Sequence, residues 1–289
     1  EVSAIRMLAE VAGRIGRYRD SEKLLRRALE LSPAFTAARA NLALVLYRQN
    51  RSEEAIAELD RPDGNGTMVV LHILCDPCDA MGANVINQVC EYLKIPIQNL
   101  SGETVTMCIL SNLVDSKLTR ARVEMVGLEK DLMERIAEAS LFALCDPYRA
   151  ATNNKGVLNG IDPILIATGN DWRAVEAGVH AYAAQKGQYR SITRWRMEGR
   201  DLIGTLEAPI SVGIVGGVTM LHPIAKLSMQ ILGVKSANEL ARIVAAVGLV
   251  QNLGALRALT TVGIIEGHMK LHIDNLSLGA GAKENELPL

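Results

Sequence analysis

MVVLHILCDPCDAMGANVINQVCEYL, residues 68 to 93, contains the change of pattern that decides the fold. The apolar run from Met68 to Cys75 predicts a strand, and the segment from about Ala80 to Leu93 predicts a helix. The residues DAMGAN, 79 to 84, form the turn between them. A glycine turn that leads from a strand into a helix can hold a phosphate group at the helix start, although a single such glycine is more often a plain turn.

The chain beyond this stretch alternates strand patterns with helix patterns. The predicted elements are a strand at Thr104 to Leu110, a helix at Glu129 to Leu144, a buried strand at Pro163 to Thr168, a helix at Asp171 to Ala184, a hairpin from Tyr189 to Glu207 that turns at Gly199, and apolar helices from Ser236 to about Leu271. We therefore predict an α+β fold in which helices pack on a mixed sheet.

Residues 1 to 61 repeat themselves at a spacing of 34 residues, with Ala4 matched by Ala38, Leu8 by Leu42 and Val11 by Val45. That period is typical of helix-turn-helix repeats, and the segment resembles a tetratricopeptide (TPR) pair. A generic helical hairpin stays the alternative, because the diagnostic tryptophan is missing. The residues from 62 to 66, PDGNG, are typical of a linker.

Composition favours a globular protein, since 49% of the 289 residues are hydrophobic and 22% are charged. A net charge of −1 argues against attraction to nucleic acid or to an anionic membrane by charge alone. No apolar run reaches the ~20 residues that span a bilayer. Five cysteines and a start without a leader pattern predict a cytoplasmic protein. Cys75 and Cys78 form a CxxC, which we interpret as accidental because it lacks the helix-start context of a redox pair.

Five further blocks follow DAMGAN in series: ILSNLVDSKLTRAR at 109–122, DPYRAATNNKGVLNGID at 146–162, ATGNDWRAVEAGVHAYAA at 167–184, GIVGGVT at 213–219 and EGHMKLH at 266–272. With these blocks, residues from about 67 to 279 resemble the catalytic core of class II 3-hydroxy-3-methylglutaryl-CoA (HMG-CoA) reductases. The resemblance implies two hydride transfers from NADH or NADPH that convert HMG-CoA to mevalonate, or the reverse, with release of coenzyme A. It also implies a homodimer or a higher assembly.

The resemblance implies a division into domains. A partial, ferredoxin-like NAD(P)-binding domain is expected over residues 67–125, and a large substrate domain over residues 126–289. The TPR-like arm of residues 1–61 and the linker of residues 62–66 precede them. Matched to the family pattern, the chain would join after the ENVIG-type dimerisation motif and the catalytic glutamate, and it would stop before a mobile helical flap. We therefore expect a truncated core whose activity is impaired.

The same resemblance assigns roles to residues at the matching positions. Lys155 would meet the negative charge that develops on the carbonyl oxygen, Asp171 would orient its ammonium, and His268 would protonate the departing coenzyme A thiolate. The cofactor would lie on Asp79, Ala80, Met81, Gly82, Ala83 and Asn84.

The substrate would bind to Arg149, Asn159 and Asn112. Arginine suits the carboxylate end of the substrate because its guanidinium is bidentate. His268 and His272, four residues apart, could also bind a metal, but no third ligand is evident and we predict no metal site.

Two other interpretations stay open at this level. In the first, the repeat arm recruits a protein partner and the reductase part only holds cofactor or coenzyme A. In the second, the chain is a fusion product without a selected function as a whole. Composition does not separate these interpretations from the reductase.

Overall fold

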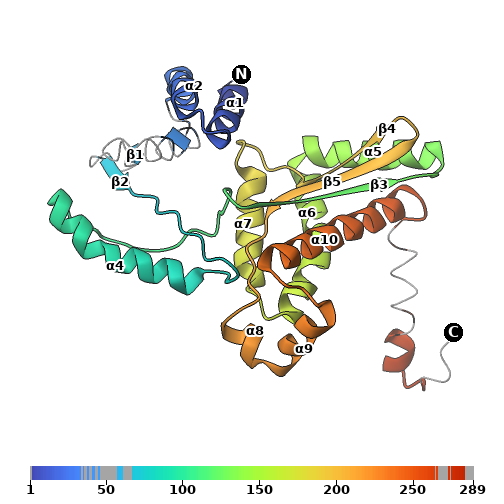
Figure 1. Cartoon of the computed structure of the whole chain (residues 1–289). Coiled ribbons are helices and arrows are strands. Elements are labelled where there is room, and N and C mark those ends of the chain that lie inside the picture. Colours follow the sequence, from blue (N-terminus) through green and yellow to red (C-terminus); the bar gives the residue numbers. More distant parts are fainter. Residues whose placement is uncertain are drawn as a thin grey trace. The chain divides into compact units, whose positions relative to one another are not determined.

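The computed structural model of this chain describes residues 2–33, 35, 38, 41–42, 45, 57–60, 67–263, 265, 273 and 275–283. The chain divides into two compact units, Glu1–Cys75 and Asp76–Leu289 (Figure 1).

The first unit contains a pair of packed helices, α1 (Val2–Arg14) and α2 (Tyr18–Leu31). Gly16 lies in the turn between them with φ +79°, a conformation that favours glycine. The Ser21 hydroxyl donates to the Ala9 carbonyl over 2.6 Å, and both residues are buried between the helices. The predicted first helical pair is therefore confirmed. Most of the predicted second repeat lies outside the described residues.

The end of the predicted arm is a strand. β1 (Ala57–Asp60) pairs antiparallel with β2 (Thr67–Val70), with Ala57 opposite Val70. The prediction of a helix up to residue 61 was wrong at 57–60, because a backbone ladder with the nearby strand at 67–70 overrides the local helix preference.

The second unit is built on a three-stranded antiparallel sheet of β3 (Leu118–Met125), β4 (Thr193–Glu198) and β5 (Asp201–Pro209), in the order β3–β5–β4. β4 and β5 form the predicted hairpin, which turns at Gly199 with φ +63°. β3 pairs with β5 along its length, from Leu118 opposite Pro209 to Met125 opposite Leu202. β3 lies within the range expected for the small domain, and it pairs with β5 of this sheet.

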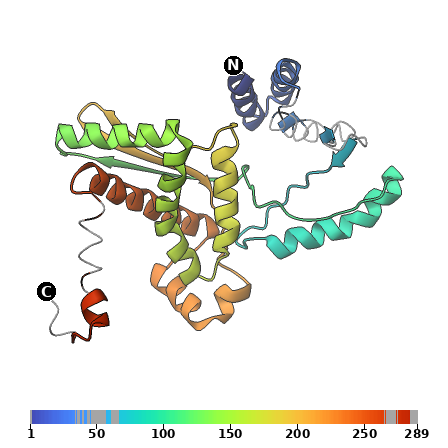
Figure 2. The same ribbon diagram turned by 180° about the vertical axis from the view of Figure 1, so that it is seen from behind.

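Helices pack against this sheet to form the main core. Those that contact the sheet are α5 (Lys130–Cys145), α7 (Trp172–Ala184) and α10 (Ala237–Thr260). α6 (Pro147–Ala167) packs on these three helices, and the shorter α8 (Gly217–Leu221) and α9 (Pro223–Leu232) lie beyond α6 (Figure 1 and Figure 2). Ile161 of α6, Leu206 of β5 and Leu249 of α10 are all at most 1% exposed in one core. By length and composition α10 alone, among the described helices, could cross a membrane, but its buried residues belong to this core.

Three strand predictions were wrong in whole or in part. Residues 163–167 form the last turn of α6 with Thr168 as its C-cap, Thr104 to Leu110 forms no strand, and only residues 68–70 of the first apolar run belong to a strand, β2. Short apolar runs do not distinguish a strand from a buried helix turn, and a strand also needs a partner. Within residues 76–117 the structure has one regular element, α4 (Ala83–Ser101), so the expected ferredoxin-like sheet is not seen there.

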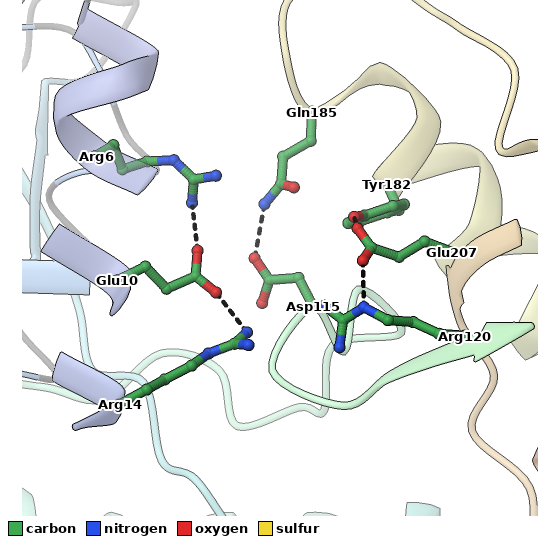
Figure 3. Close-up of polar contacts among 8 residues, drawn as sticks. All are labelled: Arg6, Glu10, Arg14, Asp115, Arg120, Tyr182, Gln185 and Glu207. Carbon is green, nitrogen blue, oxygen red and sulfur yellow. Dashed lines mark hydrogen bonds and ion pairs between the residues drawn. The ribbon is translucent and has the colours of Figure 1, made fainter. Parts of the chain in front are cut away.

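α7 is tied to the sheet by polar contacts that Figure 3 shows. The Tyr182 hydroxyl and the Arg120 guanidinium both donate to Glu207 on β5, and Gln185 donates to Asp115 over 2.6 Å. Burial raises the pKa of Glu207, but the hydrogen bonds from Tyr182 and Arg120 lower it more, so the net pKa lies below its ordinary value.

The first unit shows a similar contact within one helix. In α1, Glu10 forms ion pairs with Arg6 over 3.7 Å and with Arg14 over 2.6 Å, one helical turn away on either side (Figure 3). Such exposed pairs contribute roughly 0.3–0.5 kcal/mol each.

Candidate active site

α6 presents the predicted catalytic lysine. Asp146 begins the helix by accepting the Arg149 backbone N–H over 2.7 Å, with Pro147 at the first helical position. Lys155 and Asn159 are four residues apart and both exposed, so they share one face of the helix. The opposite face, which includes Val157 and Ile161 with no exposed surface, is buried in the core.

Two buried asparagines next to Lys155 fix the helix to the segment before β4 and to α10. Asn154 accepts the Ile192 N–H over 3.1 Å and donates to the Arg190 carbonyl over 2.9 Å. Asn153 accepts from Asn252 of α10 over 2.9 Å. The rotation of α6 is therefore set by hydrogen bonds at the two residues that precede Lys155.

Arg149 lies half-buried in the first turn of α6, and burial lowers its pKa from the ordinary value. A guanidinium stays charged at neutral pH in spite of such burial. The role of Arg149 in binding a carboxylate stays a prediction.

Asp171 is the N-cap of α7, where its Oδ1 accepts the Ala174 N–H over 3.1 Å. The side chain is exposed, so its other oxygen can face a partner. Asp171 follows the end of α6 by four residues, and Lys155 lies within that helix. Among the described residues no ion pair joins the two.

The predicted cofactor residues form one turn, which we call the DAMGAN turn (residues 79–84). Gly82 is the N-cap of α4 with φ +102°, and a Cβ there would lie 2.7 Å from Pro77. No side chain caps this helix start. The first N–H groups of α4 are therefore free for an anion, which is the arrangement that binds phosphate.

Asn112 is held beside α7 by its backbone. A Cβ on Gly178 would lie 2.5 Å from the Asn112 carbonyl oxygen, so only glycine allows this approach. The Asn112 side chain stays exposed. His268, the third predicted catalytic residue, and His272 lie outside the described residues.

Asp162, one turn beyond Asn159, is a titratable group that the sequence analysis did not single out. Burial raises its pKa to about 6, helped by the charge of Glu176 and a side-chain hydrogen bond with it. Its Oδ1 is buried without a hydrogen-bond partner among the described residues. The sequence does not reveal this group, because an Asp-Pro pair gives no indication that the carboxyl will meet Glu176 on another helix, α7.

Asp162→Asn is expected to stabilise the protein at neutral pH. Because the folded protein binds this proton more tightly than the unfolded chain, the contribution of Asp162 to stability is full below pH 3.8 and is lost as pH rises through about 6. The amide removes this penalty, a gain of about 1 kcal/mol at pH 7.5 after allowance for solvent screening. Urea unfolding at pH 4.5 and 7.5 measures it, with the exposed Glu138→Gln as control. An equal effect of Asp162→Asn at both pH values would contradict the assignment.

Comparison with known proteins agrees with these features. The model of the hydroxymethylglutaryl-coenzyme A reductase family matches residues 27–273, and so begins inside the segment expected to be a repeat arm. The 3-hydroxy-3-methylglutaryl-coenzyme A reductase of Archaeoglobus fulgidus is 47% identical over 227 residues, which cover 77% of this chain and 52% of that protein. A probable reductase of Borreliella burgdorferi is 37% identical over 214 residues, 71% of this chain and 50% of that protein. The chain thus spans about half the length of these relatives.

Solved structures give the same result. The class II reductase of Streptococcus pneumoniae bound to NADPH in open conformations has a TM-score of 0.68 at 43% identity, over 80% of this chain and 58% of that one. A second structure from the same organism has a TM-score of 0.68 at 40% identity, over 87% and 63% of the two chains. Because the family model matches residues 27–273, which are most of the chain, the chain belongs to the hydroxymethylglutaryl-coenzyme A reductase family.

Proposed function

We propose that this chain reduces HMG-CoA to mevalonate with NADH or NADPH, or catalyses the reverse reaction. The observation that carries the proposal is the geometry of α6, whose exposed face presents Lys155 and Asn159 while the asparagines on its other side are bonded into the core. Membership of the family supports it.

The chemistry needs a fixed cation. Each hydride that reaches the substrate carbonyl carbon puts negative charge on the carbonyl oxygen, and the Lys155 ammonium would stabilise it. The Asn159 amide would donate a hydrogen bond to the same region, and Arg149 would bind the substrate carboxylate. After the first hydride the C–S bond breaks and coenzyme A leaves as a thiolate. His268 would give that thiolate a proton.

The residues present fit a nicotinamide dinucleotide. The uncapped start of α4 supplies N–H groups for the pyrophosphate, and Gly82 keeps the approach free of a side chain. When bound, the reduced nicotinamide supplies the hydride. NADPH is present in the related Streptococcus pneumoniae structure.

We also propose that the chain acts as a homodimer or larger assembly. Among the described residues no ion pair joins Lys155 and Asp171, and a pair formed between copies would join the two charges. A protein partner for the first unit remains part of the proposal, since Met7, Leu8 and Ile15 of that unit are more than half exposed. The five cysteines are all free thiols, which suits a cytoplasmic location.

The test uses the whole chain. Purified protein is mixed with HMG-CoA and NADH or NADPH, and absorbance of the reduced nicotinamide is followed while mevalonate is quantified. The expected result is that two reduced nicotinamides are consumed for each mevalonate formed. Folded protein that consumes neither nucleotide, and does not oxidise mevalonate with coenzyme A and the oxidised nucleotides, would overturn the proposal.

A further inference from the structure

The DAMGAN turn is fastened to two segments far away in the sequence. The Asp79 carbonyl accepts the Ile214 N–H over 2.9 Å, and the Asp79 Oδ1 accepts the N–H of Ala237, the first residue of α10, over 2.8 Å. A Cβ on Gly213 would lie 2.4 Å from the Met81 nitrogen. The turn therefore packs directly on the backbone at residues 213–214.

The same backbone is bonded on its other side to the residue before Asp171. Asn170 Oδ1 accepts the Gly213 N–H over 2.8 Å, and Asn170 Nδ2 donates to the Thr168 hydroxyl over 3.0 Å. Asp171 follows as the N-cap of α7. A short series of contacts thus leads from Asp79 through residues 213–214 to Asn170 and Asp171.

The carboxylate of Asp79 is already engaged in this arrangement. It lies at the start of α10, where the free N–H groups and the helix dipole favour a negative charge. A carboxylate directed at the start of α4 would instead repel a phosphate group bound there.

We infer that Asp79 and Asn170 are positioning residues that hold the DAMGAN turn and Asp171 at a fixed separation through Gly213 and Ile214. This inference rests on the proposed function, in which the turn holds the nucleotide and Asp171 lies at the reacting centre. Hydride transfer needs the two reacting carbons within a few tenths of an ångström of their best approach, and a displacement of 1 Å can cost about 10²-fold in rate.

Three variants of the whole chain disturb the contacts at different points. Asp79→Ala removes the acceptor at α10, Asn170→Ala removes the acceptor for Gly213, and Gly213→Ala puts a methyl group against the Met81 backbone. Asp79→Asn keeps the Oδ1 acceptor and is the conservative rescue. Gly254→Ala, where a Cβ would meet nothing within 4 Å, is the matched control for Gly213→Ala.

The first measurement needs no nucleotide. Hydrogen exchange should speed up by about 10-fold or more at the N–H groups of residues 213, 214 and 237, which donate across these contacts, since each of the three variants loses a fixing contact or gains a clash. Residues of the α6 core should exchange as in the wild type. Asp79→Asn and Gly254→Ala should leave these three N–H groups protected.

The second measurement is kinetic. The three variants should raise the KM for the reduced nicotinamide and lower kcat/KM by about 10- to 100-fold, while Gly254→Ala stays within about 3-fold of wild type. Unchanged exchange at the N–H groups of residues 213, 214 and 237 in all three variants would overturn the inference, whatever the activity. If the wild-type chain shows no turnover but the variants show the expected exchange, the proposed function is wrong. The positioning of the DAMGAN turn by Asp79 and Asn170 is then still supported. A wild-type nucleotide KM in Asp79→Ala and Gly213→Ala, in an active protein, would also overturn the inference.

Discussion

Lys155→Met is expected to lower kcat for HMG-CoA reduction by about 10²- to 10³-fold, the cost of removing one preorganised charge donor from a developing oxyanion. The thioether keeps the length of the side chain but cannot stabilise negative charge. The free energy of unfolding should change by less than about 0.5 kcal/mol, because Lys155 is exposed and the structure gives it no ion pair among the described residues. Single-turnover kinetics and urea unfolding measure the two effects.

Lys130→Met is the matched control. It removes an exposed ammonium at the start of α5, whose ion pair with Glu134 spans 3.3 Å, and kcat should stay at the wild-type level. An equal loss of activity in both variants would show that general surface charge matters, and a wild-type kcat in Lys155→Met would remove Lys155 from the reaction.

The proposed assembly predicts a further result for the same variant. Lys155→Met and Asp171→Asn should each be inactive alone. If the pair forms between copies of a dimer, random mixing of the two variants should restore about one quarter of the wild-type rate, because half of the dimers then hold one intact site. Mixtures that stay inactive after subunit exchange would place both side chains of a working site in one chain.

Asn252→Leu is expected to lower the free energy of unfolding by about 4 kcal/mol, since it leaves several buried polar groups without partners at about 1–3 kcal/mol each. The side chain of Asn252 is 1% exposed. Its Oδ1 accepts from the Thr193 hydroxyl over 3.0 Å and from the Trp195 indole over 2.9 Å, and its Nδ2 donates to Asn153 over 2.9 Å. Leucine has a similar volume, so the loss arises from hydrogen bonds and not from a cavity.

The control is the neighbouring Gln251→Leu. Gln251 is exposed, and the same exchange of an amide for an apolar group should cost less than about 0.5 kcal/mol there. Urea unfolding followed by Trp195 fluorescence reports both variants. A change below 1 kcal/mol in the free energy of unfolding of Asn252→Leu would mean that the hydrogen bonds of Asn252 contribute little. Apolar packing alone would then set the orientation of α6.

Periodic patterns in the sequence predicted the elements whose formation depends mainly on local preferences. α5 and α7 lie within a residue or two of their predicted bounds, and the β4–β5 hairpin turns at Gly199 as predicted. The motif series predicted the family, which the comparisons confirm. The assigned roles of Lys155, Asp171 and His268 stay predictions.

The sequence by itself therefore determined the family and the set of polar residues that α6, α7 and the DAMGAN turn carry. Tertiary structure alone decided that residues 163–167 are packed as the end of a helix and not as a strand. It also decided that Asp79 accepts a hydrogen bond from the start of α10 and that Asn252 donates one to Asn153. The physical reason is the range of the interactions. Helix periodicity and turn chemistry act over a few neighbouring residues, whereas these contacts join segments far apart in the chain and form only when the core brings them together.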